Sequence, residues 1–281
     1  MAARMTSIDH YAVFGSPIKH SKSPRIHKIF ATQTEQAIVY TAQEVTAEQF
    51  SSAVSTFFDH DGKGLNCTIP LKEIAWTYAD SKTARAQTAK AVNTLIKQND
   101  GSILGDNTDG IGLITDLINN HNINLPESRI LILGAGGASR GIIGPLLEQS
   151  KHPIMIANRT IDKAVNLAAE FVHKNTAKGC GFSDLRNQQF DLIINATSLS
   201  LTGQLPPLPD DLVAKNGVCY DLAYSNEPTA FVRWGQQNNA LKSLDGLGML
   251  IEQAAEAFFI WRGIRPKTSP VIELLNAERN T

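Results

Sequence analysis

The 281-residue chain is long enough for two domains, and its 42% hydrophobic and 19% charged residues favour a folded protein with a sizeable core. Lys and Arg total 26 and Asp and Glu total 27, so a net charge of −1 argues against a nucleic-acid or anionic-membrane partner. No apolar run approaches the length of a membrane span, and the N-terminal residues carry no apolar signal region. A small molecule or another protein is the expected partner.

The three cysteines are widely spaced and odd in number, and they form no C-x-x-C pair: Cys67, Cys180 and Cys219. This spacing argues against a disulfide framework and against a zinc site, so no metal is expected. Reduced thiols are typical of the cytosol, which predicts a cytoplasmic protein.

The first third of the chain alternates between strand-like and helix-like segments. Strands are expected at 11–15, 37–45 and 64–69, and helices at 23–33 and 47–58. Asn99-Asp100-Gly101 separates the segments 91–98 and 102–105, and Asp-Gly is typical of a tight primed turn. These two segments therefore predict a hairpin, which makes the first sheet mixed.

From residue 108 onward, apolar strands alternate with helices. The expected elements are a helix at 108–120, a strand, turn and helix at 129–149, a strand at 153–160, a helix at 161–174, and strands at 190–197 and 217–224. A proline-rich loop is expected at 205–211. Continuous apolar strands between helices predict a parallel, doubly wound sheet.

The C-terminal part contains an amphipathic helix at 246–263 and a shorter helix at 268–278. The apolar face of the first helix consists of Leu247, Leu250, Ile251, Ala254, Phe258 and Trp261. Because no strand accompanies these helices, they are expected to return to the first domain, which would then be discontinuous. The predicted divisions are 1–106, 107–243 and 244–281.

A glycine-rich turn follows the strand Leu131–Leu133 and opens a helix. Its residues are Gly134, Ala135, Gly136, Gly137 and Ala138, and Ser139 stands at the third glycine position of a G-x-G-x-x-G pattern. Glycines let a pyrophosphate approach the backbone, and the helix N-terminus offers free N–H groups. The pattern predicts a dinucleotide site, and the alternative is a turn required only by packing.

The end of the next strand indicates which dinucleotide is bound. NAD sites usually place Asp or Glu there, whereas this chain has Asn158, Arg159 and Thr160, with Lys163 one helical turn further on. A guanidinium suits a 2′-phosphate, so NADP is favoured over NAD. The alternative is that Asn158 caps the helix and Arg159 is solvated.

Polar residues gather around the expected elements of the first domain. Ser23 before Pro24 is a good helix N-cap, but Ser21 is not needed for a cap, so the two hydroxyls suggest a carboxylate site. Capping is also an alternative for Asp109. The other candidates are Asn66, Thr68, Lys72, Asn93 and Gln253.

Taken together, these residues resemble the shikimate dehydrogenase family. The resemblance runs in order from residue 15 to residue 263, through GSPIKHSKSPRIH, GLNCTIPLK, AVNTL, GDNTDGIG, GAGGASRG, NRT, INATS, YDLAY and GLGMLIEQAAEAFFIWRG. Departures from the family's usual residues are Lys28, Cys67, Ala84 and Lys90.

The resemblance implies the reversible, NADP-linked reduction of 3-dehydroshikimate to shikimate, a step toward chorismate and the aromatic amino acids. It implies two α/β domains, a mixed-sheet substrate domain and a Rossmann-like NADP domain, with the active site in the cleft between them. Lys72 would be the catalytic acid/base beside Asp109. The substrate-binding residues would be Ser21, Ser23, Thr68, Lys72, Asn93, Asp109, Tyr224 and Gln253. The NADP-binding residues would be 134–138, Asn158, Arg159, Thr160, Lys163, Leu222 and Gly246.

The chemistry of ketone reduction fits a lysine at position 72. Hydride transfer builds negative charge on the ketone oxygen, and a nearby proton donor lowers that barrier. In the oxidation direction the lysine must first be neutral, so shikimate oxidation is expected to rise toward alkaline pH.

Two other functions stay open at this point. A quinate/shikimate dehydrogenase would also use NAD, and Asp162, three residues after Arg159, keeps that tolerance open. A non-catalytic NADP sensor would need the glycine turn but not Lys72 and Asp109 together. The sequence leaves both a monomer and a homodimer open.

Overall fold

The computed structural model describes residues 8–171 and 177–279, which divide by their contacts into two compact units. Unit 1 comprises the chain up to Gly112 and Leu250–Asn276, and unit 2 comprises Leu113–Met249 and the residues from Ala277 onward. The boundaries lie at 112/113 and 249/250, whereas the sequence predicts them at 106/107 and 243/244. They fall inside two helices, α5 (Asp109–Thr115) and α9 (Leu247–Arg262), each of which belongs partly to both units.

Unit 1 is built on a six-stranded mixed sheet with the order β2-β1-β3-β5-β6-β4. The strands are β1 (Asp9–Gly15), β2 (Ile38–Glu44), β3 (Gly62–Cys67), β4 (Ser81–Lys82), β5 (Thr94–Lys97) and β6 (Ile103–Asp106). Strand β1 pairs in parallel with β2 and β3, whereas β5 runs antiparallel to β3 and β6. The predicted mixed sheet is therefore confirmed.

The two faces of this sheet are covered by different helices. The helices of unit 1 besides α5 and α9 are α1 (Ser23–Gln33), α2 (Phe50–Asp59), α3 (Lys72–Tyr78), α4 (Ala84–Ala89) and α10 (Ser269–Ala277). Because side chains alternate along a strand, Phe14 of β1 packs with the apolar residues of α2, whereas Tyr11, three residues earlier and on the opposite face, packs against Trp261 of α9. The short helices α3 and α4 were not predicted.

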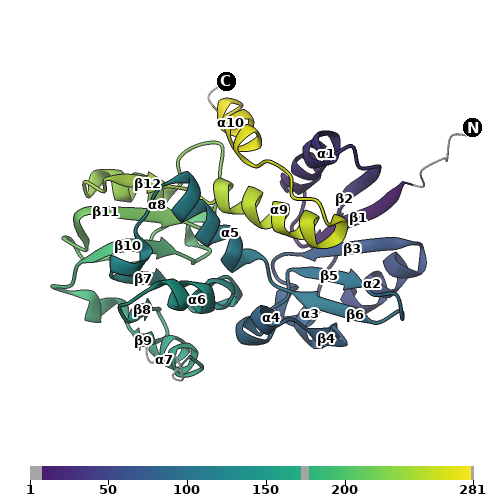
Figure 1. Cartoon of the computed structure of the whole chain (residues 1–281). Coiled ribbons are helices and arrows are strands. Elements are labelled where there is room, and N and C mark those ends of the chain that lie inside the picture. Colours follow the sequence, from purple (N-terminus) through teal and green to yellow (C-terminus); the bar gives the residue numbers. More distant parts are fainter. Residues whose placement is uncertain (1–7, 172–176, 280–281) are drawn as a thin grey trace, which may run out of the picture. The chain divides into compact units, whose positions relative to one another are not determined.

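Helix α9 is fastened to unit 1 near its C-terminal end. A Cβ atom on Gly64 of β3 would lie only 2.3 Å from Trp261 Nε1, so glycine makes room for the indole, which donates to the Leu95 carbonyl at 3.3 Å. Arg262 donates to Gln36 Oε1 at 2.8 Å and also bonds Asp9. Unit 1 thus joins two distant stretches of chain, the purple and blue elements and the yellow α9 of Figure 1.

The predicted hairpin is present, but its predicted primed turn is wrong. A primed turn of the Asp-Gly type needs positive φ at both central residues, whereas in this loop Gly101 alone has it, at 88°. The loop has three residues between Gln98 and Ser102, and Gly101 N donates to Gln98 O at 3.0 Å. Asp100 accepts from Ser102 N at 2.9 Å, which holds Asp100 in this longer loop.

Unit 2 contains a six-stranded parallel sheet with the order β12-β11-β10-β7-β8-β9. The strands are β7 (Ile130–Leu133), β8 (Ile154–Ala157), β9 (Ala177–Cys180), β10 (Phe190–Asn195), β11 (Val213–Asp221) and β12 (Lys242–Leu244). The strand order reverses between β7 and β10, which is the point where open α/β sheets bind ligands. The predicted Rossmann-like sheet is confirmed.

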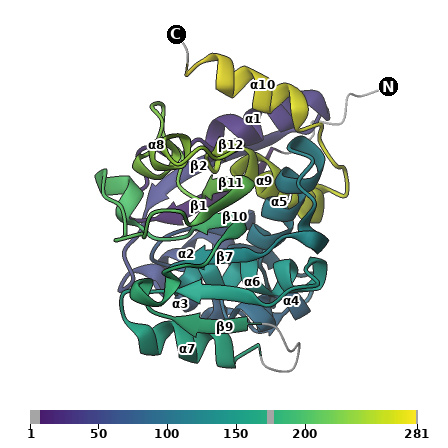
Figure 2. The same cartoon turned by 90° about the vertical axis from the view of Figure 1, so that its left-hand side faces the viewer.

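Both faces of the parallel sheet are buried. Ile132 and Ile194 point into a core with helices α6 (Gly137–Gln149) and α7 (Ile161–Ala169), and Ile193 points into a second core with Phe231 of α8 (Ala230–Gln237). Helix α7 lies beside the edge strand β9 (Figure 2). The strands β9 and β12 and helix α8 were not predicted, and residues 172–174 of the predicted helix 161–174 lie outside the described residues.

Helix α5 continues as a π-helical turn, Asp116–Asn120, and the proline-rich segment 205–211 contains neither helix nor strand. Within residues 8–171 and 177–279, no helix combines the length and apolar character that crossing a membrane requires.

Candidate active site

Lys72 and Asp109 form an ion pair in unit 1. Lys72 is the first residue of α3 and Asp109 the first residue of α5, and Lys72 Nζ lies 2.6 Å from Asp109 Oδ2. The two side chains are only 18% and 6% exposed, so the pair is largely shielded from solvent. Low exposure strengthens the attraction and holds the ammonium group in one place.

Asn93 fixes the other oxygen of the Asp109 carboxylate. Its Nδ2 donates to Asp109 Oδ1 at 2.8 Å, while its Oδ1 accepts from Thr108 N at 2.9 Å and from Thr94 Oγ1 at 2.8 Å. These acceptor contacts determine which way the amide points. The capping alternative for Asp109 is wrong, because Asn107 Oδ1 accepts the Asp109 N–H at 3.1 Å while the Asp109 carboxylate faces Lys72 and Asn93.

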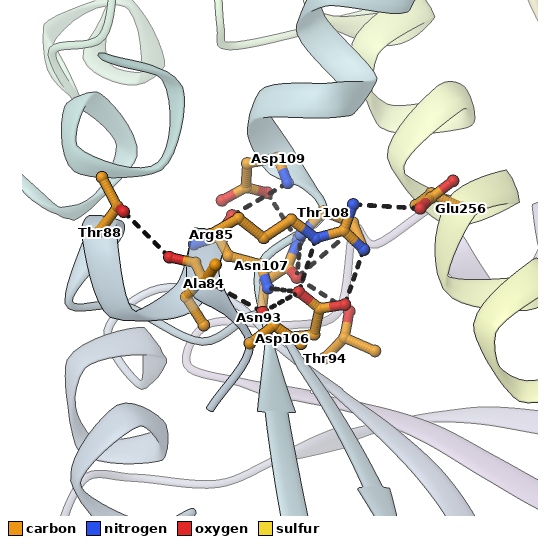
Figure 3. Close-up of polar contacts among 12 residues, drawn as sticks. Ala84, Arg85, Thr88, Asn93, Thr94, Asp106, Asn107, Thr108, Asp109 and Glu256 are labelled. Carbon is orange, nitrogen blue, oxygen red and sulfur yellow. Dashed lines mark hydrogen bonds and ion pairs between the residues drawn. The ribbon is translucent and has the colours of Figure 1, made fainter. Parts of the chain in front are cut away.

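Gln253 of α9 joins the same cluster. Its Oε1 accepts from Asn93 Nδ2 at 3.3 Å and from Thr108 Oγ1 at 3.2 Å. Thr108 was not predicted as a site residue, although it lies between two candidates in the GDNTDG segment, where its position was the only signal. Figure 3 shows Asn93, Thr108 and Asp109 close together.

Ser21 and Ser23 lie together at the start of α1, but the prediction that Ser23 caps this helix is wrong. Helix α1 begins at Ser23 with Lys22 at the N-cap position, and Ser21 Oγ accepts the Ser23 N–H at 3.3 Å. The capping contact therefore comes from Ser21, because the chain enters the helix one residue earlier than Ser23-Pro24 suggests. Two neighbouring hydroxyls at a helix N-terminus suit a carboxylate.

A buried polar chain connects this helix end with Asn93. Tyr40 donates to Asn66 Oδ1 at 2.7 Å, and Asn66 Nδ2 donates to the Asn93 carbonyl at 3.0 Å. Burial raises the pKa of Tyr40, and a hydrogen bond with Ser23 opposes that shift. Thr68 is half-buried directly after β3, where its N–H donates to the Phe14 carbonyl at 2.9 Å.

The glycine turn of unit 2 has the properties of a phosphate-binding loop. Gly134 has a φ of 105°, and a Cβ there would lie 3.1 Å from Ala196 O, so both conformation and packing require glycine. A Cβ on Gly136 would meet no atom of the described residues within 4 Å, so packing does not explain this glycine. Open space beside the free N–H groups of the first α6 turn fits a pyrophosphate.

Ser139, which departs from the glycine pattern, stabilises the turn. Its fully buried hydroxyl donates to the Gly134 carbonyl at 2.8 Å. Ala135 of the turn and Ala138 in the first turn of α6 are half-buried. The variant pattern is therefore compatible with the predicted loop.

The end of β8 carries exposed positive charge. Arg159, Thr160 and Lys163 are exposed, and Arg159 makes no hydrogen bond or ion pair with residues 8–171 or 177–279. The capping alternative for Asn158 is wrong, because its Nδ2 donates to the Thr160 carbonyl at 2.9 Å and Thr160 occupies the N-cap position of α7. The guanidinium is available for an anion such as a 2′-phosphate.

Leu222 and Tyr224 follow the carboxyl end of β11. Leu222 N donates to the Asn195 carbonyl at 2.9 Å, and a Cβ on Gly246 would lie 2.2 Å from Leu222 O, so Gly246 allows a close approach. The buried Asp221 holds this loop by accepting from Thr229 Oγ1 at 2.6 Å and from Ala223 N at 3.1 Å. Burial raises the pKa of Asp221. The sequence did not single out Asp221.

The predicted site residues are thus divided between the two units. The structure joins Lys72, Asn93, Asp109 and Gln253 by hydrogen bonds within unit 1, which also holds Ser21, Ser23 and Thr68. Unit 2 holds Tyr224 and every residue predicted to bind NADP.

Three family models match the chain. The substrate binding domain of shikimate dehydrogenase matches residues 13–95, shikimate/quinate 5-dehydrogenase matches residues 116–202, and the shikimate 5′-dehydrogenase C-terminal domain matches residues 246–275.

Relatives and solved structures resemble the chain over nearly its whole length. The shikimate dehydrogenase (NADP(+)) of Methylococcus capsulatus is 60% identical over 99% of both chains. The structure of an Ael1 enzyme from Pseudomonas putida is 44% identical with a TM-score of 0.89, covering 95% of this chain and 98% of its own. Shikimate 5-dehydrogenase from Thermus thermophilus, in complex with NADP(H) and shikimate, is 31% identical with a TM-score of 0.83 and the same coverage. The chain belongs to the shikimate dehydrogenase family of NADP-dependent oxidoreductases.

Proposed function

We propose that the protein catalyses the reversible, NADPH-dependent reduction of 3-dehydroshikimate to shikimate. The observation that carries this proposal is the hydrogen-bonded cluster of Lys72, Asp109, Asn93 and Gln253 in a chain whose relatives are named for this reaction. The reaction supplies precursors for chorismate and the aromatic amino acids.

The substrate would be held by groups suited to its carboxylate and hydroxyls. Ser21 and Ser23 offer two hydroxyls at the α1 N-terminus for the carboxylate. The ring hydroxyls would be bound by Thr68, Asn93, Asp109, Tyr224 and Gln253. Side-chain amides, carboxylates and hydroxyls can each donate to or accept from an alcohol, which is why they suit a polyhydroxylated ring.

Lys72 would move the proton of the reaction. NADPH, when bound, supplies the hydride, and Lys72 Nζ would donate a proton to the substrate oxygen as negative charge develops there. Asp109 Oδ2, 2.6 Å away, holds the Lys72 ammonium group in position. In the oxidation direction Lys72 must be neutral before it accepts the proton, so the rate should rise with pH.

NADP would bind to unit 2. The backbone N–H groups of residues 134–138 suit the pyrophosphate, and Arg159 and Lys163, beside Asn158 and Thr160, suit the 2′-phosphate. Leu222 and Gly246 would lie near the nicotinamide. The exposed, uncompensated guanidinium of Arg159 within the described residues supports NADP over NAD.

We place this activity in the cytoplasm, with small molecules as partners. Cys67, Cys180 and Cys219 are free thiols, as expected in a reducing compartment. The joint presence of Lys72 and Asp109 at hydrogen-bond distance favours an enzyme over a non-catalytic NADP sensor. Comparing NADP⁺ with NAD⁺, and shikimate with quinate, tests the quinate/shikimate alternative.

The first test is shikimate-dependent reduction of NADP⁺ by the wild type and by Lys72→Ala. We expect the variant to lose about 10²-fold or more in kcat, because a positioned proton donor contributes about that much. Lys63→Ala, which removes an exposed lysine from neighbouring β3, should keep wild-type activity.

NADP⁺ binding by each variant shows whether unit 2 is intact. A Lys72→Ala variant that binds NADP⁺ and retains full kcat would contradict the role of the lysine. A wild type that binds NADP⁺ but reduces none with shikimate would overturn the proposed reaction and favour the sensor.

A further inference from the structure

Arg85 links two segments that are far apart in the sequence. It lies on α4, and its Nε and Nη2 donate to the two carboxylate oxygens of Asp106 at 2.6 and 2.7 Å. Its Nη1 donates to Glu256 Oε1 on α9 at 3.1 Å, across 171 positions of sequence. Figure 3 shows the guanidinium between these two carboxylates. Only arginine offers such a planar fork of donors.

Asp106 controls the backbone on both sides of the polar cluster. It ends β6 and begins the turn that leads to Asp109, and its Oδ1 accepts the Asn107 N–H at 2.7 Å. Its carbonyl accepts the Asn93 N–H at 3.0 Å. Asn107 then accepts the Asp109 N–H. A shift of Asp106 would therefore move both Asn93 and Asp109.

Glu256 lies one helical turn after Gln253 on α9. Gln253 contacts Asn93 and Thr108 through its Oε1. Helices α5 and α9 approach closely at Gln253, because a Cβ atom on Gly112 of α5 would lie 2.7 Å from the backbone nitrogen of Gln253. Holding Glu256 thus sets where Gln253 sits relative to Asn93.

We propose that Arg85 is a positioning residue: by joining Asp106 to Glu256, it holds Asn93, Asp109 and Gln253 at the spacing that binds the ring hydroxyls of the substrate. The inference rests on the proposed function, and Arg85 itself touches none of the three side chains through a hydrogen bond within the described residues.

The surroundings of Arg85 allow its role to be tested in a folded variant. Asp106 keeps hydrogen bonds from Thr83 Oγ1, at 2.6 Å, and from Asn107 when Arg85 is changed, and Glu256 keeps its ion pair with Arg265. The buried carboxylates of Asp106 and Glu256 would therefore each keep at least one partner. Arg85→Lys retains the charge, but a single ammonium group cannot reproduce the fork.

The experiment measures KM for shikimate and for NADP⁺, together with the thermal stabilisation that each ligand gives. For Arg85→Lys we expect KM for shikimate to rise about tenfold, as for the loss of one or two hydrogen bonds, while KM for NADP⁺ stays within about twofold. The shikimate-dependent rise in Tm should shrink, and the NADP⁺-dependent rise should not.

Arg129→Lys is the matched control. Arg129 makes a similar two-pronged pair with Asp191, at 2.8 and 3.0 Å, but belongs to unit 2 and is 50% exposed. The Arg129→Lys variant should have the wild-type KM for shikimate and for NADP⁺. Glu256→Gln, which keeps the Arg85–Asp106 contacts, should raise KM for shikimate by about threefold.

The outcomes separate the inference from the proposed function. Unchanged KM for shikimate in Arg85→Lys, or an equal rise of both KM values, would overturn the positioning role. If Arg85→Lys does not fold, Glu256→Gln decides, and a wild-type KM for shikimate in that variant overturns the role. A wild type that binds NADP⁺ but does not oxidise shikimate would overturn the proposed function, and the inference with it.

Discussion

Lys90 ends helix α4 in the left-handed conformation, with a φ of 48°. A side chain with a Cβ is strained there, whereas glycine is not, and left-handed helix ends favour glycine for this reason. We expect Lys90→Gly to raise the free energy of unfolding by up to about 1 kcal/mol, because relief of strain exceeds the entropy cost of glycine. Urea unfolding of the two proteins measures the difference.

Lys90→Ala serves as the control, because it removes the long side chain but retains the Cβ. It should give no gain in stability, since the strain remains. An equal gain in the alanine and glycine variants would show that the side chain, and not the backbone conformation, destabilises this helix end.

At the scale of single residues, the sequence predicted which polar side chains come together in unit 1 but not how they are held. Lys72, Asn93, Asp109 and Gln253 could be predicted from their segments, and they do meet. The orientation of the Asn93 amide depends on Thr94 and Thr108 and could not be predicted. The Arg85–Glu256 contact spans 171 positions, and no local pattern encodes it.

At the scale of elements, a substitution in the turn between β7 and α6 can change NADP⁺ binding without changing the stability of the fold. Gly136 has a φ of −103°, which alanine adopts readily, and its Cβ would meet no atom of residues 8–171 or 177–279 within 4 Å. We expect Gly136→Ala to fold with wild-type Tm but to bind NADP⁺ at least about tenfold more weakly, because the methyl group occupies the space for the phosphates. Calorimetric titration with NADP⁺ measures this.

Gly134→Ala provides the contrast, because its φ of 105° and the nearby Ala196 carbonyl make alanine strained. It should lower stability by about 1–2 kcal/mol even without nucleotide. Wild-type NADP⁺ affinity in Gly136→Ala would show that the phosphates do not approach this glycine.

The elements that the sequence predicted are those whose own residues form a long or strongly apolar pattern. β7, β10 and α9 are examples, and Ile130, Leu192 and Ile251 are fully buried as expected. The elements that were missed, such as the six-residue α4 and the three-residue β12, are too short for a periodic pattern. Tertiary contacts stabilise them, as with Thr83, which caps α4 while also bonding Asp106.

At the scale of the whole molecule, a buried histidine should make stability depend on pH. His27 of α1 is fully buried and stacks on Tyr40, with ring centroids 4.0 Å apart, and neither ring nitrogen has a hydrogen-bond partner within the described residues. Burial lowers the pKa of His27 from 6.5 to about 3. The folded protein therefore keeps this ring neutral at mildly acidic pH, where the unfolded chain binds a proton.

This difference sets the sign of the effect. Between the folded value near 3 and the unfolded value of 6.5, only the unfolded state gains the proton, so stability falls as the pH drops below 6.5. The loss approaches about 1.4 kcal/mol per pH unit, or about 2 kcal/mol at about pH 5. His27→Phe keeps a flat ring that cannot be protonated. Between about pH 7.5 and pH 5, the free energy of unfolding of this variant should therefore fall by about 2 kcal/mol less than that of the wild type.

Urea unfolding followed by tryptophan fluorescence at both pH values measures the loss, since Trp261 lies 5.7 Å from His27. Comparing the change with pH, rather than absolute stability, removes any packing cost of the larger phenylalanine ring and the acid response of the carboxylates, which both proteins share. His10→Gln, at an exposed position of β1, should respond to pH like the wild type. Equal losses in the wild type and His27→Phe would mean that His27 gains a proton in the folded protein, and that the α1 packing around it opens to admit water.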